Sequence, residues 1–158
     1  MPVDKDKLSG HFRSSEFMCH CCGLSVPHPG LVLKLEQFRH IVNRPIIITC
    51  GTRCLSHNKV VSAHAKTSWH LPDKDRDGGD KDGLCSRAAD IVVVGMHPVD
   101  TARHAAVIFN GVGLYKTFVH VDVRGYNASW YGINGKELKI TRSFSNKEIV
   151  KCNSQVNT

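Results

Sequence analysis

One histidine and one aspartate stand in apolar runs of the sequence, and a second histidine stands just before an acidic segment. His70 precedes an acidic segment, Asp90 follows two alanines at the start of an apolar stretch, and His120 lies between Val119 and Val121. A histidine or aspartate that is buried in such a run needs a polar partner. Two imidazoles and one carboxylate, with a fourth position open for water, are the donors of a catalytic zinc site. His70, Asp90 and His120 are therefore candidate zinc ligands, against the simpler interpretation of ordinary hydrogen-bonded core residues.

Asp122 stands two positions after His120 in the same apolar run. Positions two apart on a strand point to the same face, so this carboxylate is expected beside the candidate ligand. It could act there as the catalytic general base that takes a proton from a metal-bound water. It could instead accept a hydrogen bond that orients a ligand histidine. The residues alone leave both roles open.

The chain has seven cysteines, an odd number that cannot all pair within one molecule. Two close sets stand out, Cys19, Cys21 and Cys22 in one and Cys50 and Cys54 in the other. Read together, Cys19-x-x-Cys22 and Cys50-x-x-x-Cys54 could supply four thiolates to a structural zinc ion. The same cysteines could form disulfides or remain buried thiols, and all three interpretations stay open.

An acidic segment separates His70 from Asp90. Its aspartates recur at nearly every second position, as at the start of a calcium-binding loop. The oxygen ligands of such a calcium site would come from Asp73, Asp75, Asp77, Asp80 and Asp82. The pattern breaks at Leu84, where a calcium loop has Glu. A solvated loop without metal is the competing interpretation.

Apolar periodicity predicts an α+β fold with a small antiparallel sheet and flanking helices. Residues 31–42 and 98–109 have the apolar spacing of helices. Strands are predicted at 46–49, 88–94, 111–115, 118–123 and 138–140. The run 46–49 is expected to be buried, and the strands around Lys116 and Thr117 are expected to form a hairpin.

No repeat or linker divides the sequence, so residues 1–158 are expected to form one domain. Its core is expected over about 10–131, with 132–158 as a C-terminal extension whose only predicted element is one strand. Nothing in the sequence fixes the oligomeric state, and we expect a monomer.

The net charge of +7 favours a polyanionic partner such as nucleic acid or an anionic cell wall. The basic residues are scattered and only 7% of residues are aromatic, so a nucleic-acid partner is not expected. No apolar run is long enough for an integral membrane protein. The polar start of the chain lacks the apolar segment of a signal peptide, so we expect synthesis in the cytoplasm and release by another factor.

A series of short motifs, taken in order, resembles the zinc D-Ala-D-Ala carboxypeptidase family, and most closely its phage and bacterial branch of small, endolysin-like cell-wall peptidases. The similarity runs from about Gly10 to Trp130. The matching stretches are His11-Phe12, Glu16-Phe17-x-Cys19, Leu35-Glu36-x-x-Arg39, Pro45-Ile46-Ile47-Ile48, Gly51-x-Arg53-Cys54, His57-Asn58, Ser68-x-His70, Ala88-Ala89-Asp90-Ile91, Gly111-Val112-Gly113-x-Tyr115 and Phe118-Val119-His120-Val121-Asp122.

The resemblance implies a hedgehog-like fold and a zinc metallopeptidase that cuts peptide bonds of peptidoglycan. It implies that His70, Asp90 and His120 bind zinc. It also implies that Arg53 polarises the scissile carbonyl or holds a substrate carboxylate, which suits a guanidinium group. Ser68 would orient the substrate or a ligand. An enzyme of this kind is expected to act at the cell wall or in the periplasm, after release by host-cell lysis machinery.

Two departures from the family pattern bear on this expectation. The relatives have no counterpart of the acidic segment between the first His and the Asp. Thr117 and Phe118 occupy the region in which relatives often carry a catalytic base, and neither can serve as one. Asp122 is therefore the candidate base. A non-catalytic, metal-containing binding module, as in the hedgehog signalling domain, is the alternative function.

Overall fold

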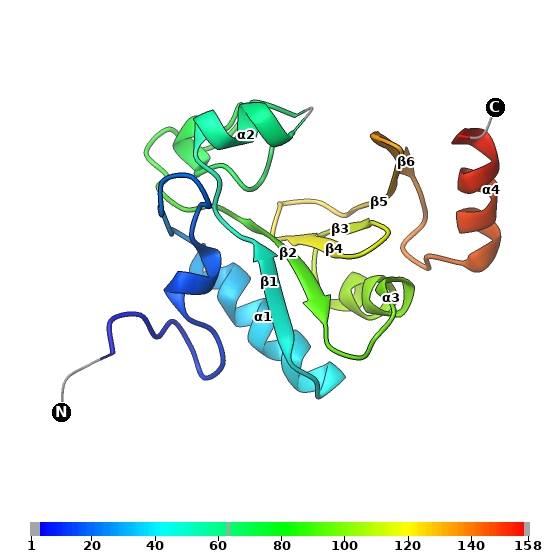
Figure 1. Ribbon diagram of the computed structural model, residues 1–158, viewed down its shortest axis with the longest axis horizontal. Coiled ribbons are helices and arrows are strands. Elements are labelled where there is room, and N and C mark those ends of the chain that lie inside the picture. The colour runs from blue at the N-terminus through cyan, green and yellow to red at the C-terminus, as the bar shows by residue number, and fades with distance from the viewer. Residues whose placement is uncertain (1–3, 63, 157–158) are drawn as a thin grey trace.

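A six-stranded sheet forms the centre of the protein in this computed structural model, which describes residues 4–62 and 64–156 (Figure 1). The strand order is β1-β2-β4-β3-β5-β6. The bounds are β1 Ile46–Cys50, β2 Ala88–Val93, β3 Gly111–Leu114, β4 Val119–Asp122, β5 Ala128–Ile133 and β6 Lys136–Lys139. All neighbouring strands are antiparallel except β3 and β5, which are parallel. The α+β prediction is confirmed, with a mixed sheet in place of a wholly antiparallel one.

The two faces of the sheet have different compositions because side chains alternate along each strand. On β2 and β4, one face carries buried apolar residues such as Ile91 and Val121, which belong to the hydrophobic core. The opposite face carries Asp90, His120 and Asp122. We call this second face the site face. Because apolar and polar residues alternate along β2 and β4, the hydrophobic core and the polar site lie on opposite faces of the same strands.

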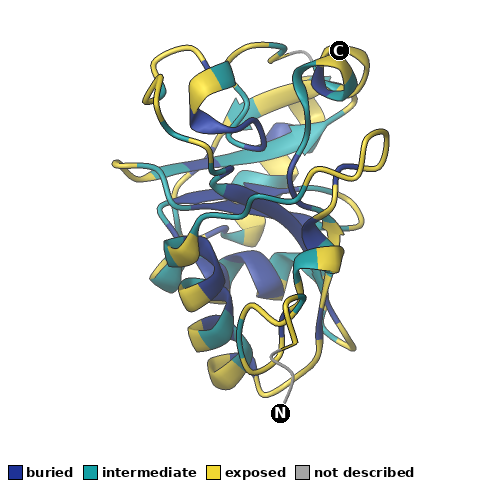
Figure 2. Ribbon diagram, turned by 90° about the vertical axis from the view of Figure 1, so that its left-hand side faces the viewer, coloured by how far each residue is buried: buried dark blue, intermediate teal, exposed yellow. Residues whose placement is uncertain are grey.

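Two helices cover the core face. They are α1 (Pro29–Val42) and α3 (Pro98–Ile108), whose buried residues include Leu35 and Ala105. The short α2 (Leu55–Val61) lies on the opposite side of the sheet from α1 and α3 (Figures 1 and 2). No helix within the described ranges is long and apolar enough to cross a membrane.

Local sequence accounts for the ends of α1 and α3. A histidine caps the first turn of each helix, with His28 Nδ1 accepting from the Gly30 backbone N–H at 3.0 Å in α1. A proline follows each cap, where its missing N–H costs nothing. Asn43 then ends α1 in the left-handed region, with φ of 48°. The helices and strands predicted within 31–123 all occur within a few residues of their predicted bounds.

Strand β1 is an edge strand, so the expectation of a buried run at 46–49 is wrong. Ile46 is buried, but the side chain of Ile47 is 52% exposed. Only β2 pairs with β1 among the described strands, which leaves the outer edge of β1 open.

Residues 132–156 belong to the same folded body as the sheet. β5 and β6 extend the sheet, and α4 (Asn146–Val156) packs beside β5. Phe144 is fully buried in the core. The Arg142 guanidinium donates to the carbonyls of Ala106 and Phe109 at the end of α3, the first at 2.6 Å. Cation donors are favourable at a helix C-terminus, so this contact ties the C-terminal segment to α3.

Candidate metal centre

Asp90 and His120 lie directly opposite each other on neighbouring antiparallel strands β2 and β4. Both side chains project from the site face. His70 reaches them from the segment that follows α2, and its carbonyl accepts a hydrogen bond from the Arg53 N–H at 2.9 Å. Three sequence-distant residues therefore converge on one point.

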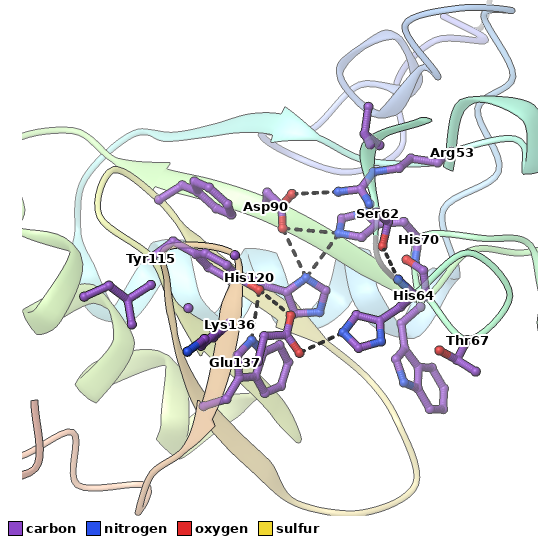
Figure 3. Close-up of a pocket in the computed structure, with 18 of the residues that line it drawn as sticks. Arg53, Ser62, His64, Thr67, His70, Asp90, Tyr115, His120, Lys136 and Glu137 are labelled. Atoms are coloured by element: carbon purple, nitrogen blue, oxygen red, sulfur yellow. Dashed lines mark hydrogen bonds and ion pairs between the residues drawn. The ribbon is translucent and has the colours of Figure 1, made fainter. Parts of the chain in front are cut away.

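Three donor atoms form a nearly equilateral triangle there (Figure 3). His70 Nε2 lies 3.2 Å from Asp90 Oδ1 and 3.1 Å from His120 Nδ1, and the latter two atoms are 3.1 Å apart. Tetrahedral zinc with bonds of about 2.0–2.1 Å separates its ligand atoms by about 3.3 Å. The spacing of this donor triangle therefore fits three ligands of one zinc ion.

In each histidine, the ring nitrogen that faces away from the donor triangle is already hydrogen-bonded; we call it the outer nitrogen. His70 Nδ1 lies 2.7 Å from the Gly51 carbonyl, and His120 Nε2 lies 2.9 Å from Asp122 Oδ2. Both partners are acceptors, so each outer nitrogen carries the proton and donates it. When both rings are neutral, the inner nitrogens keep lone pairs that point at each other and at Asp90. Three mutually close acceptors require a shared cation, and this observation fits a metal ion.

The electrostatics of the triangle favour positive charge. Burial works to lower the pKa of His70, but the Asp90 carboxylate outweighs it and raises that pKa to about 10. Burial works to raise the pKa of Asp90, while His70 and His120 hold it well below its usual range. An ionised carboxylate enclosed in this way is stabilised by a cation beside it. A zinc ion would supply that charge in place of a proton on His70.

Cys50 forms an alternative donor set with His70 and Asp90. Its sulfur lies 3.9 Å from His70 Nδ1, which is the nitrogen that donates to Gly51. Nε2 is the nitrogen that faces Asp90 and His120. We therefore take His120 as the third ligand. Cys50 lies beside the triangle and apart from the other close cysteines, which argues against the one interpretation that made it a ligand together with Cys54.

Asp122 is fully buried behind His120. Its carboxylate takes two hydrogen bonds from the Arg124 side chain, at 2.8 and 2.5 Å, besides the one from His120. Burial works to raise the pKa of Asp122, but the bonds from Arg124 and His120 hold it well below the usual range. Such a carboxylate is a weak proton acceptor. The geometry favours the orienting role for Asp122 over the expected general-base role.

Two glycines on β3 provide the space for this arrangement. Gly111 is opposite Asp122, and a Cβ on it would lie 2.2 Å from the Asp122 carboxylate oxygens. Gly113 is opposite His120, and a Cβ on it would lie 2.4 Å from the Trp130 ring. Neither position tolerates a side chain without moving a neighbour of His120. The Gly-x-Gly spacing was part of the family resemblance, and this contact gives its physical reason.

Arg53 and Ser68 both line the cleft at the triangle. Arg53 Nη2 donates to Asp90 Oδ2 at 3.2 Å, the oxygen beside the one in the triangle, and its Nε donates to Cys50 Sγ at 3.1 Å. Ser68 Oγ accepts from the His70 N–H at 3.3 Å. Arg53 therefore orients Asp90, and Ser68 supports the backbone of His70.

The acidic segment begins after the turn at His70 and ends at β2, and it does not separate the ligands. The Arg87 N–H donates to the Trp69 carbonyl at 3.0 Å, which closes the segment at its base. Asp73 is buried and accepts from Arg76 and from Arg87, each at 2.8 Å. The Arg76 guanidinium stacks on Trp69 at 3.7 Å. The segment is thus folded around one carboxylate.

These contacts argue against the expected calcium site. Asp73, its first expected ligand, is already neutralised by two arginines. The other four expected ligands, Asp75, Asp77, Asp80 and Asp82, belong to no potential metal-binding group found among the described residues. The segment acts as a structural insertion in this arrangement.

An open cleft of about 910 Å³ lies over the triangle. Its wall includes Glu137 on β6, whose carboxylate accepts from the Tyr115 hydroxyl at 2.8 Å and lies 3.1 Å from His64 Nε2. Figure 3 shows this Glu137–His64 pair in the same cleft as His120. Glu137 and His64 could not be predicted as site residues from the sequence, because both lie in polar segments without apolar periodicity.

Comparison with known proteins gives a family. Residues 10–122 match the Peptidase M15 family, which is more than half of the chain and includes all three residues of the triangle. No curated protein and no solved structure matches the chain. The family expected from the sequence motifs is confirmed by this match. The chain belongs to the peptidase M15 family, whose members are zinc-dependent metallopeptidases.

Proposed function

We propose that this protein is a zinc peptidase that hydrolyses the short peptides of bacterial peptidoglycan. The observation that carries the proposal is the donor triangle of His70, Asp90 and His120 at an open cleft. A zinc ion there would leave a fourth position for water, lower the pKa of that water and polarise a peptide carbonyl. The metal-holding residues thereby lie where a substrate can reach them.

The residues around the cleft have separate tasks in this proposal. Asp122 and the Gly51 carbonyl fix the two histidine rings, so that their lone pairs face the metal position. Glu137 is the cleft carboxylate that takes the proton of the attacking water, and His64 holds it in place. This role replaces the one first expected for Asp122.

The lining of the cleft suits a peptide with a free carboxylate. Arg53, Lys116 and Lys136 contribute cationic groups, while Trp69 and Phe118 contribute apolar surface. A guanidinium beside the metal can bind the substrate carboxylate or the polarised carbonyl oxygen. The net charge of +7 would favour approach to an anionic wall. We propose an endolysin-like action at the cell wall, after release by lysis machinery.

Mass analysis of peptidoglycan fragments tests the proposal. Purified muropeptides would be incubated with the zinc-loaded protein, with and without a chelator, and with Asp90→Asn as the inactive control. Chelator-sensitive loss of a terminal residue would indicate carboxypeptidase action, and separation of cross-linked peptides would indicate endopeptidase action. Unchanged fragments after incubation with fully zinc-loaded wild-type protein would contradict the proposed function and favour a binding module.

A further inference from the structure

A second group of potential metal ligands lies apart from the donor triangle. Its members share sulfur side chains whose Sγ atoms all lie within 4.8 Å of one another. We call it the cysteine cluster, and it consists of Cys19, Cys21, Cys22 and Cys54. The sulfur of Cys21 is 3.6 Å from that of Cys19 and 3.2 Å from that of Cys54. The cluster joins two segments that are far apart in sequence.

We propose that the cysteine cluster binds one structural zinc ion, separate from the ion at the donor triangle. Four sulfurs at zinc bonds of about 2.3 Å lie about 3.8 Å apart around a tetrahedral ion. The observed separations are near that value and well above the roughly 2.0 Å of a disulfide bond. A sulfur such as that of Cys21, with two sulfur neighbours at similar distances, fits a shared centre better than a single pair.

The backbone around the cluster is arranged to hold sulfur ligands. Three of the cysteines lie in a tight turn that two backbone hydrogen bonds close. The Cys19 N–H donates to the Leu24 carbonyl at 2.7 Å, and the Gly23 N–H donates to the Cys19 carbonyl at 2.8 Å. Gly23 has a φ of +75°, which a side chain would strain. The Cys54 N–H then donates to Cys19 Sγ at 3.4 Å. N–H donors of this kind favour a negatively charged thiolate.

His57 is a further polar partner of the cluster sulfurs. His57 Nδ1 lies 3.3 Å from Cys19 Sγ, and the His57 N–H donates to Cys54 Sγ at 3.4 Å. Ligand thiolates of a metal site are commonly supported by such outer contacts. The three remaining cysteines, Cys50, Cys85 and Cys152, lie outside the cluster.

A metal here would stabilise a weakly packed part of the fold. Of the seven residues of α2, the polar Asn58 is the one that is buried, so apolar packing contributes little to holding this helix. Cys54 immediately precedes α2 and follows Arg53, which contacts Asp90. The zinc ion would thus fasten the start of α2 and the Arg53 backbone to the N-terminal turn.

Metal content of the purified full chain tests the proposal. We expect about two zinc ions per chain in the wild type and about one in the Asp90→Ala/His120→Ala variant. Cobalt substitution of that variant should give an intense thiolate-to-cobalt charge-transfer band. The Cys21→Ser/Cys22→Ser variant should lose this band in the same background. Cys85→Ser, at a half-buried cysteine outside the cluster, is the matched control and should retain it.

Thiol titration gives a second readout that does not depend on the folding of a variant. In denaturant and chelator without a reductant, wild-type protein should show all seven thiols. Fewer reactive thiols would indicate disulfides at the cluster and overturn the proposal. Absence of zinc and of the charge-transfer band in the Asp90→Ala/His120→Ala variant would also overturn it, whatever the activity of the wild type.

Discussion

The Asp122 carboxylate accepts a hydrogen bond from Nε2 of His120 at 2.9 Å, on the side of the ring that faces away from the donor triangle. Arg124 holds the same carboxylate through two further bonds. Asp122 thus sets the tautomer and the orientation of His120. In this arrangement Asp122 positions a metal ligand, whereas the proposed acceptor of the water proton is a different carboxylate, Glu137.

Replacing Asp122 by Asn should weaken zinc binding more than it weakens catalysis by the metal-loaded enzyme. The amide would still fill the space, but it would no longer stabilise the proton on His120 Nε2. Loss of such an outer partner lowers metal affinity by about 10–100-fold. Competition with a fluorescent chelator measures the affinity, and excess zinc should restore most activity. Loss of activity at full zinc occupancy would instead assign Asp122 to the proton transfer.

Gly111→Ala should reproduce the Asp122→Asn effect without changing any ligand or polar group. The added Cβ would lie 2.2 Å from the Asp122 carboxylate oxygens, so that side chain must move. We expect a lower melting temperature and weaker zinc binding. Gly125→Ala is the matched control, because no heavy atom lies within 4 Å of its added Cβ. Equal zinc affinity in both variants would contradict the role given to Asp122.

Glu137→Gln should lower kcat by about 100-fold or more while leaving the zinc content unchanged, because a general base contributes about 100- to 10,000-fold. Glu36→Gln is a suitable control, since Glu36 binds His11 and does not line the cleft. Near-normal kcat in Glu137→Gln would remove Glu137 from the proposed mechanism.

Asp73→Asn should destabilise the protein by about 3 kcal/mol, because it leaves Arg76 and Arg87 without their shared buried counter-charge. The melting temperature should fall by roughly 5–10 °C. Asp82→Asn, at an exposed position of the same segment, should change it little. Thermal unfolding followed by circular dichroism compares the two variants. Stabilisation of the wild type by millimolar calcium, lost in both variants, would restore the calcium-loop interpretation.

The strand positions of the triangle could be predicted from sequence because they follow from simple alternation. Asp90 and His120 interrupt apolar runs, and Val119 and Val121 assign the neighbouring positions to the core face. His70 could be placed beside them only through the motif resemblance. No pattern in the local sequence predicts the hydrogen bond from the Arg87 N–H to the Trp69 carbonyl, which closes the acidic segment at its base.

The strand predicted at 138–140 overlaps β6 (Lys136–Lys139), but β5 and α4 were not predicted, because their stabilising contacts are distant in sequence. Helix α4 is polar on average, with Cys152 as its buried residue, and its apolar stripe is made of few residues, so the segment resembles a polar tail in the sequence. Glu137 lies on the mostly exposed edge strand β6, where its residue type gives no sign of a cleft. The orienting role of Asp122 depended on Arg124 and on which ring nitrogen of His120 faces inward. These are properties of the three-dimensional arrangement.

The position of the metal in zinc-loaded crystals tests the central claim most directly. Anomalous diffraction at the zinc edge should give a peak about 2.0–2.2 Å from His70 Nε2, Asp90 Oδ1 and His120 Nδ1. A peak at the cysteine cluster would be a separate feature. A fully zinc-loaded crystal with no peak at the triangle, or with a peak bound through Cys50 and without His120, would contradict this account of the site.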